Sequence, residues 1–258
     1  MKHSIKLTAT FAAALFLVSA SGQINRATGS SNTTGSGGAP SVTSECPDDI
    51  EAIDDCPITG CGELGDAELN TAKNSEAVPP AAEISNMTLA NIKSLAQPAR
   101  WNTGSNRARL KAAGEGRAVR VMGFLLRVKP EGGESCNCEL TARAQTDVHL
   151  VLVDHSDDLE QESISAEITP RVRQHQGHDP KWQFKNVNDI EGDYVRVTGL
   201  LMLDTKHIRQ AHRLSGERLN KGLVRATNWE VHPIIKLEVC VKSIKACKAN
   251  KQGAWEDF

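Results

Sequence analysis

Acidic and histidine side chains recur as close pairs in the second half of the chain. Three such pairs occur: Asp147 with His149, Asp204 with His207, and Glu230 with His232. In an extended strand, residues two apart project from the same face, so the first and last pairs each set a carboxylate beside an imidazole. Such a pair can bind a divalent metal ion or orient a histidine base. The sequence therefore predicts metal ligands at Asp147, His149, Glu230 and His232.

A purely structural role is the alternative for these pairs. The outward face of a half-buried strand is polar by default, and a contact between an acid and a histidine across strands needs no function. Asp204 and His207 fall where a strand runs into a long loop, which is polar in any protein. The chain has no His-Glu-x-x-His sequence, serine elbow or phosphate loop that would favour a known catalytic machinery.

Basic residues concentrate in the last third of the chain. The whole chain has a net charge of -2, yet residues 205–251 carry 11 basic and 3 acidic side chains, whereas residues 21–104 carry 4 basic and 11 acidic ones. A basic surface attracts an anionic partner, although most charged stretches are only solvated faces. The side chains that we expect to contact an anionic polymer or nucleic acid are Lys206, Arg209, Arg213, Lys221 and Arg225.

Few aromatic side chains are available for stacking on bases. Strand alternation directs Trp229 and Phe124 into the core, and Tyr194 is the one aromatic residue that we expect to be exposed on a strand. Proteins that hold single strands usually offer several exposed rings. Binding driven by charge is therefore the form of nucleic-acid interaction that the sequence favours.

Five segments show the alternation of half-buried strands, and they must position these residues. They are residues 117–128, 147–153, 164–169, 193–203 and 225–239. In the last segment Trp229, Val231 and Ile235 point inward, which turns Glu230 and His232 outward. In the third segment Glu167 also points outward. Residues 171–188, between the third and fourth strands, have a broken helical pattern.

Five strands with a helical piece between the third and fourth resemble an oligonucleotide/oligosaccharide-binding (OB) barrel. The stretch EGDYVRVTG in particular resembles the fourth strand of OB domains. The set GCG, SCNC, TDVHL, EITPRVR and NWEVHP is also similar to exported bacterial proteins of unknown activity. The resemblance implies a mainly β fold and a bias toward binding. An SH3-like barrel or a small sandwich is the alternative fold.

The beginning of the chain has the features of an exported protein. Residues 1–20 combine Lys2 and Lys6 with a short apolar run and end in Val-Ser-Ala, which predicts a signal peptide cleaved near Ala20. Residues 21–44 are rich in Gly, Ser and Thr and predict a disordered linker. No stretch is long enough to span a membrane. We expect a secreted or periplasmic protein.

The remaining chain divides into three expected parts. Residues 45–104 form an acidic extension, with short helical patterns at 67–73 and 87–95; residues 105–248 form the barrel domain; residues 249–258 form a tail. The seven cysteines are disulfide candidates: Cys46, Cys56, Cys61, Cys136, Cys138, Cys240 and Cys247. We expect a local bridge between Cys240 and Cys247 and a link from the first three cysteines to the Cys136–Cys138 pair. A zinc site built from Cys56, Cys61, Cys136 and Cys138 is the alternative.

Three classes of function agree with these features. The leading one is an exported OB-like module that binds an anionic ligand such as nucleic acid or another polyanion. The second is a metal-dependent hydrolase of phosphodiesters, in which a divalent metal activates water. The third is a structural exported module without catalysis. The sequence specifies neither an oligomeric state nor the identity of the metal.

Overall fold

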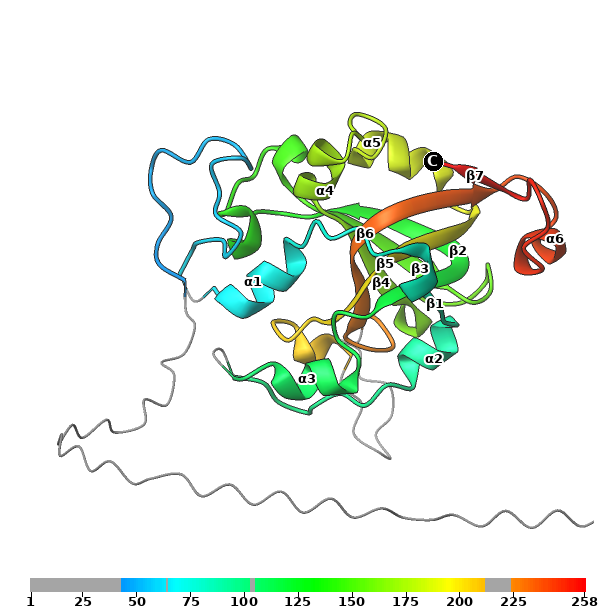
Figure 1. Cartoon of the computed structure of the whole chain (residues 1–258), viewed down its shortest axis with the longest axis horizontal. Coiled ribbons are helices and arrows are strands. Elements are labelled where there is room, and N and C mark those ends of the chain that lie inside the picture. The colour runs from blue at the N-terminus through cyan, green and yellow to red at the C-terminus, as the bar shows by residue number, and fades with distance from the viewer. Residues whose placement is uncertain (1–42, 64, 103–104, 212–223) are drawn as a thin grey trace, which may run out of the picture. The chain divides into compact units, whose positions relative to one another are not determined.

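Five long strands close into a barrel in this computed structural model (Figure 1), which describes residues 43–63, 65–102, 105–211 and 224–258. The barrel strands are β2 (Ala118–Pro130), β3 (Val148–Val153), β4 (Ile164–Ile168), β5 (Tyr194–Leu203) and β6 (Trp229–Cys240). Their order is β2-β3-β4-β6-β5, and β5 pairs again with β2, which closes the barrel. The predicted five-stranded OB-like barrel is confirmed.

The strand pairing is mixed and follows the OB pattern. All neighbouring barrel strands are antiparallel except β4 and β6, which run parallel and meet at Ala166 and Val231. Two short strands extend the sheet: β1 (Ser85–Asn86) pairs with β2, and β7 (Trp255–Asp257) pairs with β6. The sequence did not indicate β1 and β7, because two or three residues are too few to show alternation.

Short helices surround the barrel. They are α1 (Ala67–Lys73), α2 (Leu89–Lys93), α3 (Ala108–Ala113), α4 (Pro170–His175), α5 (Phe184–Val187) and α6 (Ile244–Lys248). The helices α4 and α5 lie between β4 and β5, as predicted, and α1 and α2 confirm the two helical patterns of the extension. Asp66 begins α1 by accepting hydrogen bonds from the backbone N–H groups of Glu68 and Leu69. Two 3-10 turns, Ser135–Asn137 and Arg143–Gln145, lie in the loop between β2 and β3.

Inward-facing residues of all five strands fill the core. The core includes Val121, Leu150, Ile164, Val197 and Trp229, each fully buried. One inward position of β6 was predicted wrongly: Ile234, rather than Ile235, belongs to the core cluster. The pairing of β6 with β5 shifts near Gly199, where a Cβ atom would lie 2.3 Å from the carbonyl oxygen of Pro233. The absence of a side chain at Gly199 thus allows the irregularity that changes the alternation.

Three disulfides occur among the described residues, and one of them attaches the N-terminal extension to the loop between β2 and β3. The pairs are Cys46–Cys61, Cys56–Cys138 and Cys240–Cys247, and Cys136 is a buried free thiol. The predicted local bridge and the predicted link between the two cysteine groups are both confirmed. The alternative of a cysteine zinc site is wrong, because Cys56, Cys61 and Cys138 are already consumed in disulfides.

The residues from 43 onward form one compact unit. The extension packs on the barrel within this unit, and the limits of 45–104, 105–248 and 249–258 stay predictions. The predicted signal peptide and nearly all of the predicted linker lie outside the described residues. Within the described ranges, no helix has the length and apolar character needed to cross a membrane.

Candidate functional site

The outward faces of three neighbouring strands carry the predicted acid–histidine pairs. Asp147 immediately precedes β3 and His149 lies on it; Glu167 lies on β4, and β6 carries Glu230 and His232. His149 pairs directly with Glu167 across the β3–β4 ladder. We call these five residues the carboxylate–histidine cluster. They gather in one place because β3, β4 and β6 are adjacent in the barrel.

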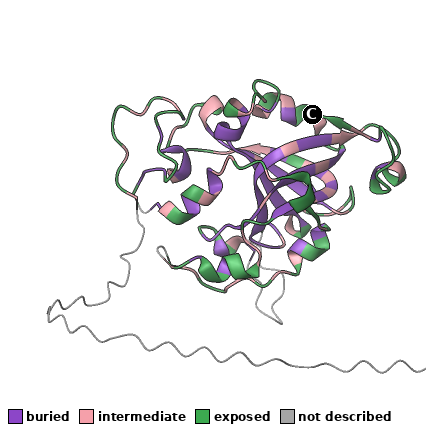
Figure 2. Ribbon diagram, in the orientation of Figure 1, coloured by how far each residue is buried: buried purple, intermediate pink, exposed green. Residues whose placement is uncertain are grey.

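The cluster is buried, which corrects the expectation of an exposed strand face. Glu230 and His232 are each 1% exposed, and Asp147 is equally enclosed. Most residues of β3, β4 and β6 are buried, and these strands are largely purple in Figure 2. The prediction failed because strand alternation separates the inside of a barrel from its outside, but cannot show that an extension covers the outside.

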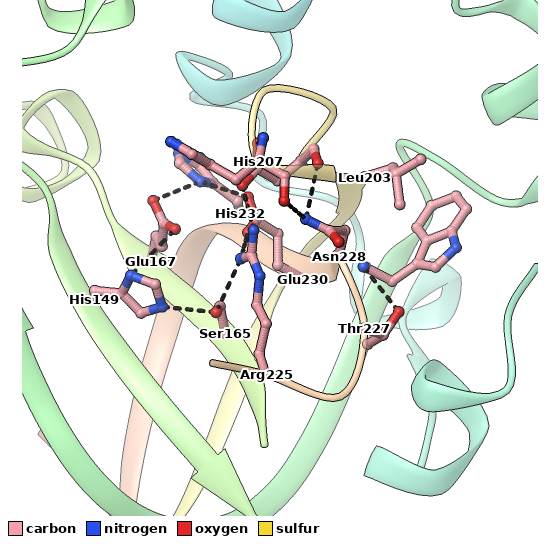
Figure 3. Close-up of polar contacts among 12 residues, drawn as sticks. His149, Ser165, Glu167, Leu203, His207, Arg225, Thr227, Asn228, Glu230 and His232 are labelled. Carbon is pink, nitrogen blue, oxygen red and sulfur yellow. Dashed lines mark hydrogen bonds and ion pairs between the residues drawn. The ribbon is translucent and has the colours of Figure 1, made fainter. Parts of the chain in front are cut away.

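Asp147, Glu167 and His232 form the centre of the cluster. Figure 3 shows Glu167 and His232 with their neighbours His149, Arg225 and Glu230. The His232 Nδ1 lies 3.0 Å from the Glu167 Oε2, and the His232 Nε2 lies 3.6 Å from the Asp147 Oδ2. Each residue offers a ligand atom within 4.8 Å of the others. The Asp147 Oδ2 and the His232 Nε2 have no hydrogen-bond partner among the described residues. Two facing polar atoms are thus buried and unsatisfied, which is costly in a protein interior.

Arg225 occupies the side of the cluster next to Glu230. Its Nη1 lies 2.9 Å from the Glu230 Oε2, and its Nη2 forms an ion pair with Asp204. Asp204 in turn accepts from the backbone N–H of Lys206 and lies 3.0 Å from the Nδ1 of His207. The buried guanidinium therefore neutralises two carboxylates, and Glu230 is engaged in an ion pair while it also lies 3.3 Å from His232.

His149 faces away from the central three residues. Its Nδ1 lies 2.9 Å from the Glu131 Oε1, whereas the nearest oxygen of Glu167 is 3.7 Å away. Its Nε2 lies 2.6 Å from the Ser165 Oγ, to which Arg225 also donates. Ser165 therefore links His149 to Arg225 through hydrogen bonds.

The extension and the loop between β2 and β3 enclose the cluster. Asn137 donates to the Asp147 Oδ1 at 2.8 Å, and Asn74 donates to the carbonyl oxygen of Cys136 at 2.7 Å. Lys73 of α1 pairs with Glu134 at 2.7 Å. Two cavities reach this region: a groove of about 1030 Å³ has His232 in its lining, and a smaller cavity of about 260 Å³ is bordered by Lys73, Glu134 and Cys136.

Burial and neighbouring charge shift the titration of the central residues in opposite directions. Burial raises the pKa of Asp147 to about 7, although the nearby His232 opposes the rise. Burial also tends to lower the pKa of His232, but the attraction of Glu167 and the hydrogen bonds to Glu167 and Glu230 together outweigh it and raise the pKa to about 10. For Glu167, burial favours a higher pKa, yet His232 and His149 bring it below its ordinary value. Such divergent values are characteristic of functional sites.

The structure brings together part of the predicted ligand set. Asp147 and His232 lie in the centre, Glu230 borders it beside Arg225, and His149 turns toward Glu131. Glu167 is the third central residue; the sequence placed it on the outward face but did not mark it as a ligand. Its position opposite His149 on the next strand was the available signal. Ser165 and Asn137 were missed, since neither lies in an acid–histidine pattern. Metal binding by the four predicted residues stays a prediction.

The predicted anion-binding loop divides into three groups. Arg225 is buried and paired with Asp204 and Glu230. Lys206 and Arg209 are exposed. Arg213 and Lys221 lie outside the described residues. Tyr194, expected to be exposed, is only 7% exposed and contacts Phe124, which lies outside the barrel core instead of inside it.

The fold and the cluster together define an OB-type barrel with a covered carboxylate–histidine site. No family model matches the chain, and no curated protein matches it. Among solved structures, it is similar to an asparaginyl-tRNA synthetase from Entamoeba histolytica in complex with asparaginyl-adenylate, with 14% identity over 62% of this chain and 24% of that chain and a TM-score of 0.30. An aspartyl-tRNA synthetase from the same organism is 14% identical over 63% and 26%, with a TM-score of 0.27.

This chain spans about a quarter of the length of those synthetases. The OB assignment rests on the strand order and on the parallel pairing of β4 with β6.

Proposed function

We propose that this protein is an OB-fold module that holds a divalent metal ion at Asp147, Glu167 and His232. The metal site would bind an anionic ligand such as a phosphodiester, or hydrolyse it. The observation that carries the proposal is the facing pair of unsatisfied atoms, the Asp147 Oδ2 and the His232 Nε2. A cation between them would satisfy both, because a metal takes a carboxylate oxygen and an imidazole nitrogen as ligands.

The ligand set favours particular ions. One imidazole and two carboxylates suit zinc or manganese better than calcium, which prefers oxygen ligands alone. Three protein ligands would leave coordination positions for water and for an oxygen of the ligand, which is the arrangement of catalytic rather than structural sites. When bound, the ion would supply an activated water.

Neighbouring residues have supporting roles in this proposal. Asn137 donates to the second oxygen of Asp147 and fixes that carboxylate. The hydrogen bonds between His149, Glu131 and Ser165 orient the imidazole next to Glu167. Arg225 holds Glu230 in an ion pair. Glu230 would therefore add negative charge beside the ion without being one of its ligands.

Thermal melting of the chelator-treated protein tests the metal site. Addition of zinc or manganese should raise the melting temperature, and an ion at about 100 times its Kd should stabilise the fold by about 2.7 kcal/mol. The isosteric variants Asp147→Asn and Glu167→Gln should abolish the metal-dependent gain. The matched control Glu238→Gln, on the far end of β6, should keep it. A wild-type melting temperature that ignores both ions would refute the proposal.

A second candidate function is binding of a polyanion through the loop after β5. It is favoured by Lys206, which is exposed beside His207 at the border of the smaller cavity, and by the exposed Arg209. Each phosphate contact releases counterions, so affinity should fall steeply with salt. Single-stranded DNA binding should weaken by about tenfold or more between low and moderate salt. The variant Lys206→Gln/Arg209→Gln should reduce that dependence; equal binding by this variant would exclude the loop.

The three disulfides also bear on location. Disulfides persist in oxidising compartments, which supports the proposal that the protein is secreted or periplasmic after cleavage near Ala20. N-terminal sequencing of the exported protein should begin at or near Ser21. A mature chain that still begins with Met1 would contradict the proposed signal peptide.

A further inference from the structure

A projecting segment at the C-terminal side of the barrel combines exposed lysines with exposed apolar side chains. Residues 241–254, which we call the tip, connect β6 to β7 and include α6; in Figure 1 the tip stands away from the barrel at the red end of the colour scale. The tip follows the end of β6, whereas Glu230 and His232 lie near the start of that strand. The tip therefore contributes no residue to the carboxylate–histidine cluster.

Positive charge on the tip is uncompensated within the segment. Its four lysines are exposed: Lys242, Lys245, Lys248 and Lys251. No acidic residue occurs between Glu238 and Glu256. Within the described part of the chain, these lysines form no ion pair; Lys242 donates to the carbonyl oxygen of Gln252, and Lys248 lies over the ring of Tyr194. Of the carboxylates that flank the tip, Glu238 is paired with Arg196 and Lys236, and Asp257 with Lys236. Glu256 of β7 is exposed, so the segment and its flanks still carry an excess of positive charge.

Apolar side chains are exposed on the same segment. Val241 is 51% exposed and Ile244 is 38% exposed. Large exposed apolar side chains are uncommon elsewhere in the described residues, and these two lie only three positions apart. Apolar groups surrounded by lysines are typical of surfaces that enter the interface of an anionic membrane.

The tip is held rigidly in this exposed arrangement. The Cys240–Cys247 disulfide closes it, and the backbone N–H of Val241 donates to the carbonyl oxygen of Ala254 at 3.0 Å. Ser243 begins α6 by accepting a hydrogen bond from the backbone N–H of Ala246. A segment that is already ordered loses little conformational freedom when it docks.

Charge and exposure on the tip favour a lipid surface over a nucleic acid. Stacking of bases needs free aromatic faces. The ring of Tyr194 is buried beneath Lys248, and the half-buried ring of Trp255 has the guanidinium of Arg196 over it. We propose that the tip docks this protein on an anionic lipid surface, with its lysines on the headgroups and Val241 and Ile244 in the interface.

Sedimentation with lipid vesicles tests the proposal on the full chain. The protein should bind vesicles that contain phosphatidylglycerol and should not bind vesicles of phosphatidylcholine alone. The variant Lys245→Gln/Lys251→Gln should weaken partitioning by about tenfold or more, because each lysine near an anionic surface contributes strongly. The variant Val241→Ser/Ile244→Ser should weaken it by about fivefold, because it removes the inserted apolar groups.

Control variants separate the tip from the general charge of the protein. The variant Lys111→Gln/Lys185→Gln removes two exposed lysines elsewhere, and Leu159→Ser removes an exposed apolar side chain; both should bind vesicles like the wild type. Equal losses in the control and tip variants would overturn the proposal. So would binding to a single-stranded oligonucleotide that needs Lys245 and Lys251 but not Val241 and Ile244, since that pattern identifies a polyanion site. Absence of binding to anionic vesicles at low salt would also overturn it.

Discussion

Buried carboxylates at the two ends of β6 have different partners. Near its start, Glu230 and His232 join Asp147 and Glu167 beneath the N-terminal extension, and two of their polar atoms have no partner among the described residues. Near its end, Glu238 lies between Arg196 and Lys236, at 2.7 and 3.1 Å. The cation partners lower the pKa of Glu238 against the effect of burial, whereas burial raises that of Glu230.

This difference indicates that the surroundings of Glu238 favour stability, whereas those of the carboxylate–histidine cluster do not. A carboxylate that has two cationic partners is satisfied as the protein stands. A carboxylate that is enclosed with a raised pKa reduces stability, and such groups occur mostly where a protein needs them for chemistry or binding. The Glu238 face is therefore the internal standard against which the carboxylate–histidine cluster can be measured.

The largest expected change in stability comes from removing a disulfide, and it should differ between the N-terminal extension and the tip. The Cys56–Cys138 disulfide closes 82 residues and the Cys240–Cys247 disulfide closes 7. Chain entropy predicts that replacing the first pair by serine lowers the free energy of unfolding by about 4 kcal/mol and replacing the second by about 2 kcal/mol. Denaturant unfolding measures both. Equal losses would show that the extension gains no special stability from its bridge.

The second largest loss of stability should follow replacement of Arg225 or Arg196, the arginines that pair with Glu230 and Glu238. Arg225→Ala leaves Asp204 and Glu230 buried without their cation and should cost about 3 kcal/mol. Arg196→Ala leaves Glu238 with Lys236 in a more solvated position and should cost about 1 kcal/mol. The comparison uses urea titration of the two variants. If both lose the same free energy, the two faces do not differ in the way described.

Isosteric neutralisation should change stability with opposite signs on the two faces. Burial raises the pKa of Asp147 to about 7 from an unfolded value of about 3.9, so this residue lowers stability as pH rises from about 4 to about 7, and the loss is complete above pH 7. In metal-free protein above that pH, Asp147→Asn should stabilise by about 1 kcal/mol, and the gain should vanish toward pH 4. Glu238→Gln should destabilise by about 1 kcal/mol. Melting curves across pH test both, and a destabilised Asp147→Asn protein would contradict the assignment.

The smallest effect belongs to a histidine at the rim of the extension. Hydrogen bonds that His175 donates to Asp54 and Glu76 raise the pKa of this partly exposed histidine. Its stabilising contribution is complete below its unfolded pKa and is lost as pH rises through the raised folded value. Solvent screening limits the effect to less than about 0.5 kcal/mol. His175→Gln should remove this dependence between pH 6 and 8, about the range in which histidine titrates; an unaltered profile would assign it to another group.

The sequence predicted the barrel well because the barrel depends on alternation. Runs such as VRVMGFLL and VRVTGLLM contain the period of a half-buried strand, and the order of strands and helices then selected the OB pattern. The glycine inside the 193–203 run, Gly199, indicated a bulge, and the pairing of β5 with β6 does shift there. Its effect on the alternation of β6 was not predicted, because that effect arises from close contact between Gly199 and Pro233. The strands β1 and β7 were too short to produce a signal.

The site was predicted in its residues but not in its environment. Asp147 and His232 were identified from local spacing, since residues two apart share a strand face. Their burial depends on Asn137 and on the Cys56–Cys138 link, which join segments far apart in the sequence. The role of Arg225 was also hidden, because its partner Asp204 lies 21 positions away. Contacts of this kind are products of tertiary packing, and single-sequence periodicity does not contain them.

The extension and the loop between β2 and β3 also limit how fast molecules exchange between solvent and the centre of the cluster. The side chains of Asp147 and His232 have no solvent exposure, although His232 lines the large groove, so a molecule larger than water reaches them from that groove only when the covering segments move. Local opening of packed segments occurs over microseconds to seconds, far more slowly than exchange at an open surface. The lifetime of any species held beside Asp147 is therefore set by the motion of the cover as well as by its affinity.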